Sequence, residues 1–238
     1  QPVVTWRRPA GYHGVEFQAT NAEEATDIKH WLEPDASVHL IPNLGRKLGG
    51  APPAERRKQR GELKLVSVAR IAVEKNALFA IECLKDVPGD ITFDLYGPIY
   101  DEPYWAQCQQ AIAQLPSNVR VQHKGTINPE EVPALFGGYH ALFMPSQGEN
   151  FGHTMAEALS AGLPLLISDR TPWRGLTEQH AGWDLALDRP QGFTSALKEL
   201  ASMDQVALGG WSNGAFQLAA RYLADPGPIE KTLCLFKQ

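Results

Sequence analysis

The stretch ALFMPSQGENFGHTMAEALSAGLPLLIS, residues 141–168, contains two apolar runs separated by a glycine-containing loop and a segment of helical periodicity. The runs at 141–145 and 163–168 predict short buried strands. Between them, apolar residues recur at helical spacing over 153–161, and a glycine and a proline then end the helix. Strand and helix alternate across this stretch, which is typical of a parallel sheet.

The same alternation continues on both sides of this stretch. Further strands are predicted at 63–69, 91–96 and 119–125, with helices at 74–85, 102–115 and 130–136. Beyond Asp188 the pattern is mostly helical, with candidates at 190–203, 205–224 and 228–236. Apolar strands that alternate with helices form sheets covered on both faces. We therefore predict an α/β fold with a doubly wound parallel sheet and a helical C-terminal extension.

The first 62 residues divide into two parts. Residues 1–45 contain a strand, a helix that begins near Asn21 and a second strand, and we expect them to be the end of another domain. Residues 46–62 hold Gly, Pro and a run of basic residues, which predicts a solvated interdomain linker. Contact of this linker with anionic lipid headgroups is the alternative. The remainder, 63–238, is predicted to be the main domain, and the opening Gln1 suggests a piece of a longer chain.

Composition argues against several classes of protein. The chain has 238 residues, of which 43% are hydrophobic, enough for one substantial core. A formal net charge of −5 gives no electrostatic reason to expect a nucleic-acid partner. The three cysteines are scattered without zinc-ligand spacing, which suits a reducing cytoplasm. We find no run of membrane-spanning length and no signal peptide, and predict a cytoplasmic location, with peripheral attachment to the inner face of a membrane as the alternative.

Residues with useful chemistry follow the predicted strands, at the edge where parallel sheets bind ligands. Arg70 and Lys75 follow the first strand of the main domain, and a glycine-containing loop that opens a helix follows the fourth. Such a loop presents backbone N–H groups that suit phosphate. Glu149 and Glu157 can accept paired hydrogen bonds from vicinal diols. Phosphate and two diols together describe a sugar nucleotide.

Three segments carry a resemblance to a known family: SVARIAVEKN (67–76), KGTINPEEVPALF (124–136) and PSQGENFGHTMAEALSAGLPLLISD (145–169). With them, residues 64–200 resemble the donor-binding C-terminal domain of retaining GT-B glycosyltransferases, specifically glycosyltransferase family 4 with its E-x7-E motif. That domain is Rossmann-like. TPWRGLTEQHAGW, residues 171–183, resembles a bacterial branch used for surface polysaccharide assembly. Two upstream segments, FQATNAEEA and VHLIPN, resemble the final part of the family's N-terminal domain.

The resemblance implies a catalytic group of Arg70, Lys75 and Glu149. The two cations would hold the donor diphosphate, and Glu149 would engage the transferred sugar. Glu157 would bind the ribose hydroxyls, and the backbone around Ile127 would meet the base.

The remaining donor-binding residues implied by the resemblance surround the start of one helix. They are Gly148, Asn150, Phe151, Gly152, His153 and Thr154. The backbone of 150–152 would line the sugar pocket, and Thr154 would face the distal phosphate. The family commonly has an aliphatic residue where His153 stands, so the role of this histidine is open. Trp173 either packs at the sheet edge or contacts the sugar.

The function implied is transfer of a hexose from a nucleoside diphosphate sugar with retention of configuration, in surface polysaccharide or glycoconjugate synthesis. The acceptor, a glycan or a lipid-linked glycan, would bind the N-terminal domain, so we expect this chain alone to bind nucleotide without transferring sugar. The sequence lacks D-x-D, so we expect neither a metal nor another cofactor. G-x-G-x-x-G and Walker A motifs are also missing. A non-catalytic sugar-nucleotide-binding module and a glycan phosphorylase are the alternatives.

Overall fold

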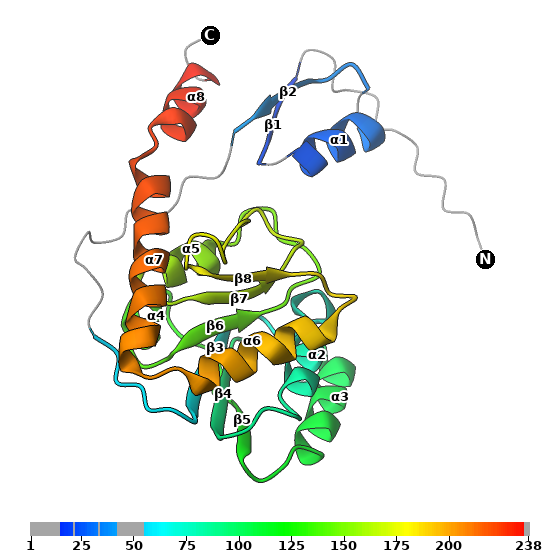
Figure 1. Ribbon diagram of the computed structural model, residues 1–238. Helices are drawn as coiled ribbons and strands as arrows, with labels where there is room; N and C mark the ends of the chain where they lie inside the picture. Colours follow the sequence, from blue (N-terminus) through cyan, green and yellow to red (C-terminus); the bar gives the residue numbers. More distant parts are fainter. Residues whose placement is uncertain (1–14, 21, 33, 42–54, 236–238) are drawn as a thin grey trace. The chain divides into compact units, whose positions relative to one another are not determined.

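The computed structural model describes residues 15–20, 22–32, 34–41 and 55–235 (Figure 1). By their contacts, the described residues up to 41 and those at 225–235 form one compact unit, and residues 55–224 form a second, larger unit. The sequence-based division placed residues 225–235 with the main domain, whereas contact clustering groups them with the smaller unit.

The larger unit is built on a six-stranded sheet with the order β5-β4-β3-β6-β7-β8. All of its strand pairs are parallel. The strands are β3 (Glu62–Val68), β4 (Asp90–Tyr96), β5 (Val119–His123), β6 (Ala141–Met144), β7 (Leu165–Ser168) and β8 (Gly182–Leu185). The chain runs outward from β3 to β5 and then returns to β6 on the other side of β3. The order therefore reverses between β3 and β6, and ligands bind doubly wound sheets at such a switch point.

Helices cover both faces of this sheet, and each face has its own apolar core (Figure 1). The first core includes Phe93, Phe143 and Phe193 under α2 (Ala77–Cys83), α3 (Glu102–Ala113) and α6 (Pro190–Ser202). The second includes Phe136, Met155 and Leu165 under α4 (Val132–Phe136), α5 (His153–Ser160) and α7 (Gln205–Ala224). The prediction of a doubly wound, Rossmann-like α/β sheet is confirmed.

The helix predicted over 74–85 is interrupted near its start. Residues Val73–Lys75 form a short 3-10 turn, and α2 begins only at Ala77. Between them, Asn76 adopts a left-handed conformation with φ of 60°. Its side-chain Nδ2 donates a hydrogen bond to the carbonyl of Pro145 at 3.0 Å, which supports this unusual conformation. Lys75 consequently lies in a loop at the sheet edge and not on a continuous helix.

Strand β8 was not predicted from the sequence. It has four residues and follows a turn, so it offers no long apolar run. Gly182 at its start has φ of 141°, and a Cβ added there would lie 2.0 Å from the carbonyl oxygen of Leu165 on β7. The glycine therefore permits the close approach through which β8 joins the sheet.

The smaller unit has the strand, helix and strand that the sequence predicts. β1 (Glu16–Ala19) pairs in parallel with β2 (Ser37–Leu40), and α1 (Ala22–Trp31) connects them. The same unit includes α8 (Gly227–Leu235). Among the described residues, no helix has the length and apolar character needed to cross a membrane.

The basic segment before β3 differs from the predicted solvated linker where it is described, from residue 55 onward. The side chains of Arg56 and Lys58 are buried, with 7% and 4% of their surface exposed. His140 also holds this segment, because its Nε2 donates to the carbonyl of Arg57 at 3.0 Å while its Nδ1 accepts from the backbone N–H of Lys64. Burial lowers the pKa of His140 to about 4, so its ring is neutral at pH 7. The prediction of a solvated linker is wrong for Arg56 and Lys58, whereas residues 55, 57, 59 and 60 are exposed as predicted. Residues 46–54 lie outside the described ranges.

Candidate functional site

Two loops meet at the switch point of the sheet. One follows β3 and contains Lys75, and the other follows β6 and contains Glu149. The backbone N–H of Gln147 donates to the carbonyl of Glu74 at 2.8 Å, and the amide of Asn76 binds Pro145. These bonds bring the predicted phosphate-binding loop and the predicted sugar-binding loop together.

An ion pair joins Lys75 to Glu149 across these loops. Lys75 Nζ lies 2.6 Å from Glu149 Oε1, and the two side chains are only 20% and 12% exposed. Because both charges are largely removed from water, their attraction is stronger than that of a surface pair. The sequence placed both residues at one edge but did not predict that they pair. The pair sets a cation and a carboxylate in one small polar site, where an anion and a hydroxyl can each find a partner.

Arg70 lies apart from that pair. Its guanidinium contacts Glu74 at 2.6 Å and lies 5.3 Å from the centre of the Tyr100 ring. The Arg70 side chain is 49% exposed, so it remains open to solvent at the same edge of the sheet. The structure therefore places Arg70 beside the loops while its own contacts hold it near the surface.

The start of α5 forms the second part of the site. Gly152 caps the helix with φ of 76°, and it contributes no side-chain acceptor to the first turn. The first turn therefore presents backbone N–H groups and the positive end of the helix dipole, a combination that suits an anion. Thr154 Oγ1 donates to the carbonyl of Val68 at 3.3 Å, which ties the helix start to the end of β3. Glu157 is half-buried, one turn further along the same helix.

A third loop, which follows β7, supports the loop that carries Glu149. The backbone N–H of Glu149 donates to the carbonyl of Arg170 at 3.1 Å. Ser168 donates its hydroxyl proton to the carbonyl of Ser146 and accepts a bond from the N–H of Arg170. Ser168 and Asn76 were not predicted from the sequence, because their roles depend on bonds to the distant residues Ser146 and Pro145.

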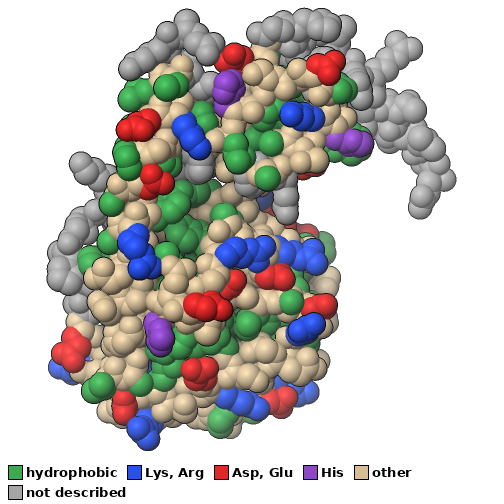
Figure 2. Space-filling model, turned by 45° about the horizontal axis from the view of Figure 1, so that its top comes forward, with side chains coloured by type: hydrophobic (Ala, Val, Ile, Leu, Met, Phe, Trp, Pro, Cys, Tyr) green, Lys and Arg blue, Asp and Glu red, His purple; other side chains and the backbone are tan. Residues whose placement is uncertain are grey.

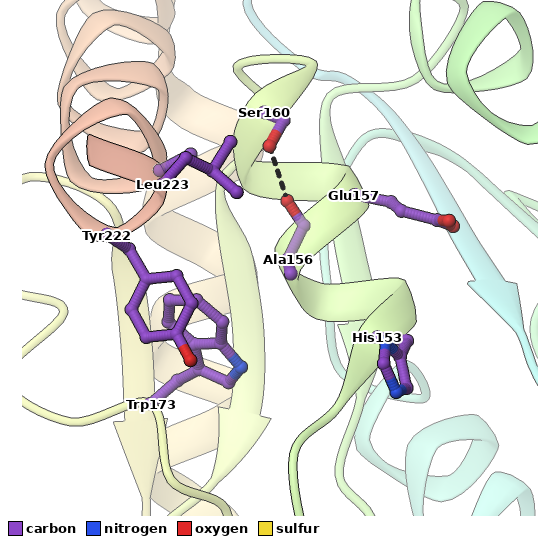
Figure 3. Close-up of a pocket in the computed structure, with 8 residues that line it drawn as sticks. His153, Ala156, Glu157, Ser160, Trp173, Tyr222 and Leu223 are labelled. Atoms are coloured by element: carbon purple, nitrogen blue, oxygen red, sulfur yellow. Dashed lines mark hydrogen bonds between the residues drawn. The ribbon is translucent and has the colours of Figure 1, made fainter. Parts of the chain in front are cut away.

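Aromatic side chains pack beside the helix start, next to a small hollow (Figure 3). Trp173 is 6% exposed, and its Nε1 donates to the carbonyl of Phe151 at 2.9 Å. The ring of Tyr222, on α7, lies 5.1 Å from that of Trp173 and 5.8 Å from that of Phe151. Trp173 thus packs at the sheet edge, which was one of its two predicted roles. Sequence analysis did not identify Tyr222, which lies far along the chain.

His153 lies against one of these rings, whereas Glu157 points away from them. The exposed ring of His153 lies 4.6 Å from that of Phe151, whose side chain is buried. Figure 3 shows the Glu157 carboxylate directed away from α7, with Tyr222 and Leu223 on the opposite side of α5. The carboxylate therefore lies on the side of α5 opposite Tyr222 and Leu223.

The other predicted donor-binding residues lie in the surrounding loops. Gly148 and Asn150 are exposed in the loop before α5. Ile127 follows β5 and packs partly against the second core. In the described part of the chain, no three His, Cys, Asp or Glu residues gather as metal ligands.

More than half of this chain matches the pattern of a known protein family. The pattern of the family described as Glycosyl transferases group 1 matches residues 53–203. The chain belongs to this family. The matched range contains the sheet from β3 to β8 and every predicted site residue.

Curated relatives of this group 1 glycosyltransferase chain include two bacterial transferases. A 2-deoxystreptamine glucosyltransferase of Streptomyces kanamyceticus is 35% identical over 101 residues, which are 41% of this chain and 25% of the relative. The GtfA subunit of a UDP-N-acetylglucosamine–peptide N-acetylglucosaminyltransferase of Streptococcus pneumoniae is 30% identical over 114 residues, 46% of this chain and 21% of the relative. The matches span about a quarter of these relatives' length.

Solved structures share the fold of this group 1 glycosyltransferase chain. HepE of Anabaena, in complex with UDP and glucose, matches with a TM-score of 0.73 and 16% identity, over 93% of this chain and 62% of HepE. TarM of S. aureus matches with a TM-score of 0.71 and 15% identity, over 94% of this chain and 44% of TarM. The predicted resemblance to the donor-binding C-terminal domain of GT-B glycosyltransferases is confirmed at the level of this family.

Proposed function

We propose that this chain is the donor-binding part of a family 4 enzyme that transfers a hexose from a nucleoside diphosphate sugar with retention of configuration. The observation that carries the proposal is the meeting, at one switch point, of the Lys75–Glu149 pair and the helix start that precedes Glu157. The cation and the helix start suit a diphosphate, and the two carboxylates suit the diols of a sugar and a ribose.

In the proposed complex, Lys75, the N–H groups at the start of α5 and Thr154 hold the diphosphate. Arg70 is exposed and can turn from Glu74 toward the same phosphates. Glu157 binds the ribose, and the backbone near Ile127 meets the base. Glu149 holds the transferred sugar against the backbone of 150–152.

The proposed reaction breaks the bond between the anomeric carbon and the diphosphate, and the electron pair leaves with the diphosphate oxygen. The acceptor oxygen forms the new bond on the same face of the sugar, and its proton passes to the departing diphosphate. Lys75 and the helix dipole stabilise the negative charge that develops there. The acceptor, a glycan or lipid-linked glycan of surface polysaccharide synthesis, is bound by further parts of the enzyme.

Known proteins support the choice of donor. GtfA was solved in complex with UDP and GlcNAc, and HepE in complex with UDP and glucose. We therefore propose a UDP-hexose as donor. Figure 2 shows Lys and Arg side chains interspersed with Asp and Glu side chains on the surface that it displays. Calorimetry with UDP, GDP and their glucose conjugates tests the proposal; a Kd of about 10 μM to 1 mM for UDP is expected, and binding to none of them would contradict it.

Substitutions of the two carboxylates should distinguish the residue that binds the ribose from the residue that binds the transferred sugar. Glu157→Gln is expected to weaken UDP and UDP-hexose alike by about 1–3 kcal/mol, because it removes a charged acceptor from the ribose. Glu149→Gln should weaken only the UDP-hexose, since Lys75 then remains available for the diphosphate. Calorimetric Kd values for both ligands measure this. Equal losses of UDP affinity in the two variants would contradict the assigned roles.

Donor binding is expected to be independent of divalent metal. Lys75 and the start of α5 supply the positive charge that a metal would otherwise bring to the diphosphate. Titration of UDP in excess EDTA should give a Kd within twofold of that measured with magnesium. A tenfold loss of affinity in EDTA, about 1.4 kcal/mol, would show that a metal takes part.

A further inference from the structure

We infer that Arg56 is a positioning residue for the donor site, because it fixes the far end of the helix whose first turn receives the diphosphate. Its guanidinium donates from Nη1 to the carbonyl of Gly162 at 2.9 Å and from Nη2 to the carbonyl of Ala161. Both carbonyls stand at the C-terminal end of α5. The inference rests on the proposed function only in assigning the diphosphate to the opposite end of this helix.

The end of α5 leaves these two carbonyls to Arg56. Gly162, with φ of 64°, donates its N–H to the carbonyl of Leu159, and the N–H of Leu163 bonds to that of Ala158. This is the Schellman arrangement, which satisfies carbonyls inside the last turn. The carbonyls of Ala161 and Gly162 lie beyond it, at the negative end of the helix dipole, where a cation is favoured.

Arg56 also joins α5 to α7. Nη1 donates to the hydroxyl of Ser212 on α7 at 3.2 Å. Ala215 and Ala219 of α7 are buried in the same core as α5. Further along α7, Tyr222 packs on Phe151 and Trp173 at the start of α5. A shift at Arg56 therefore affects both the helix that carries Glu157 and the helix that supports the sugar loop.

The buried guanidinium of Arg56 contributes directional hydrogen bonds more than it contributes stability. Burial lowers the pKa of Arg56 to about 10, so the guanidinium stays charged at pH 7. Arg56 Nε is buried without a partner in the described part of the chain. A buried cation with an unpaired N–H is a weak source of stability, and an apolar side chain often serves as well. Its hydrogen bonds, in contrast, fix where two helices lie, and α5 is only about 12 Å long.

Lys58, two residues after Arg56, provides a matched control. Lys58 Nζ donates to the carbonyls of Ala201 and Met203 at 3.2 and 2.8 Å. These carbonyls stand at the C-terminal end of α6, which covers the opposite face of the sheet and carries no predicted site residue. Arg56→Met and Lys58→Met thus remove the same kind of contact from two helices, only one of which belongs to the site.

The test compares these variants in the whole chain. Arg56→Met should weaken UDP binding at least tenfold, whereas Lys58→Met should stay within twofold of the original chain, even if both lower the melting temperature equally. Arg56→Lys should be intermediate, because an ammonium donates from one nitrogen whereas the Arg56 bonds leave from Nη1 and Nη2. Equal effects of the two methionine variants, or unchanged UDP affinity in folded Arg56→Met, would overturn the inference.

Amide hydrogen exchange without ligand separates this inference from the proposed function. Arg56→Met should speed exchange at least tenfold in α5 while α6 is unchanged, and Lys58→Met should do the reverse. If the original chain does not bind UDP, the proposed function fails, but the exchange pattern still decides the role of Arg56. Should Arg56→Met not fold, Ser212→Ala should show a smaller increase confined to α5 and α7. Unchanged exchange in α5 would overturn the inference.

Discussion

Replacement of Lys75 by methionine is expected to weaken UDP binding about 100-fold and to lower the free energy of unfolding by about 2–3 kcal/mol. The affinity is expected to fall because, in the proposed complex, the diphosphate loses the half-buried ammonium of Lys75. The stability falls because Glu149, only 12% exposed, is left without its partner at 2.6 Å. Calorimetry measures the first effect, and urea unfolding measures the second.

A double substitution distinguishes the two effects. In Lys75→Met with Glu149→Gln, no carboxylate is left unpaired, so most of the lost stability should return while UDP binding stays weak. Arg120→Met is the matched control, because Arg120 pairs with Asp90 at 2.6 Å on the exposed surface and should change stability by no more than about 0.5 kcal/mol. Recovery of UDP affinity in the double variant would contradict the role of Lys75 in holding the diphosphate.

Gly182→Ala is expected to destabilise the larger unit by about 3 kcal/mol or more. Gly182 has φ of 141°, and an added Cβ would lie 2.0 Å from the carbonyl oxygen and 2.6 Å from the nitrogen of Leu165. Since both atoms belong to the backbone of β7, a rotamer change cannot relieve the contact. Thermal unfolding should show a large fall in melting temperature, and loss of the β7–β8 pairing should appear as faster amide exchange in both strands.

Gly209→Ala, in contrast to Gly182→Ala, should stabilise the larger unit. Gly209 lies in α7, and an added Cβ there would meet nothing within 4 Å. Alanine is favoured over glycine in a helix by about 1 kcal/mol, so a small rise in melting temperature is expected. A destabilised Gly209→Ala variant, or a neutral Gly182→Ala variant, would show that local backbone geometry does not govern these positions.

The sheet could be predicted because its strands are short apolar runs. Of the strands in the larger unit, only β8 escaped prediction, since Gly182 and Asp184 interrupt its apolar character. The rule that parallel sheets bind ligands at the carboxyl ends of their strands also predicted that Lys75 and Glu149 lie at one edge of the sheet, where the structure has them. Local pattern and topology therefore suffice for the architecture and for the approximate place of the site.

The contacts within the site could not be predicted, because they join residues far apart in the sequence. Lys75 and Glu149 are separated by 74 positions, and nothing in their spacing indicates a pair. The left-handed conformation of Asn76 depends on a bond to Pro145, 69 positions away. Arg56 and Lys58 stand in a basic run of the kind that is usually solvated, and only the carbonyls at two helix ends explain their burial.

The bond between Arg56 and Ser212 also sets an order of events during synthesis. The two residues are 156 positions apart, so Arg56 leaves the ribosome long before its partner on α7 exists. At about 5–20 residues per second, that interval is roughly 8–30 s. Its other partners, the carbonyls of Ala161 and Gly162, are 105 and 106 positions away, so they are made before Ser212. The contacts that bury Arg56 are therefore complete only once Ser212 has been made.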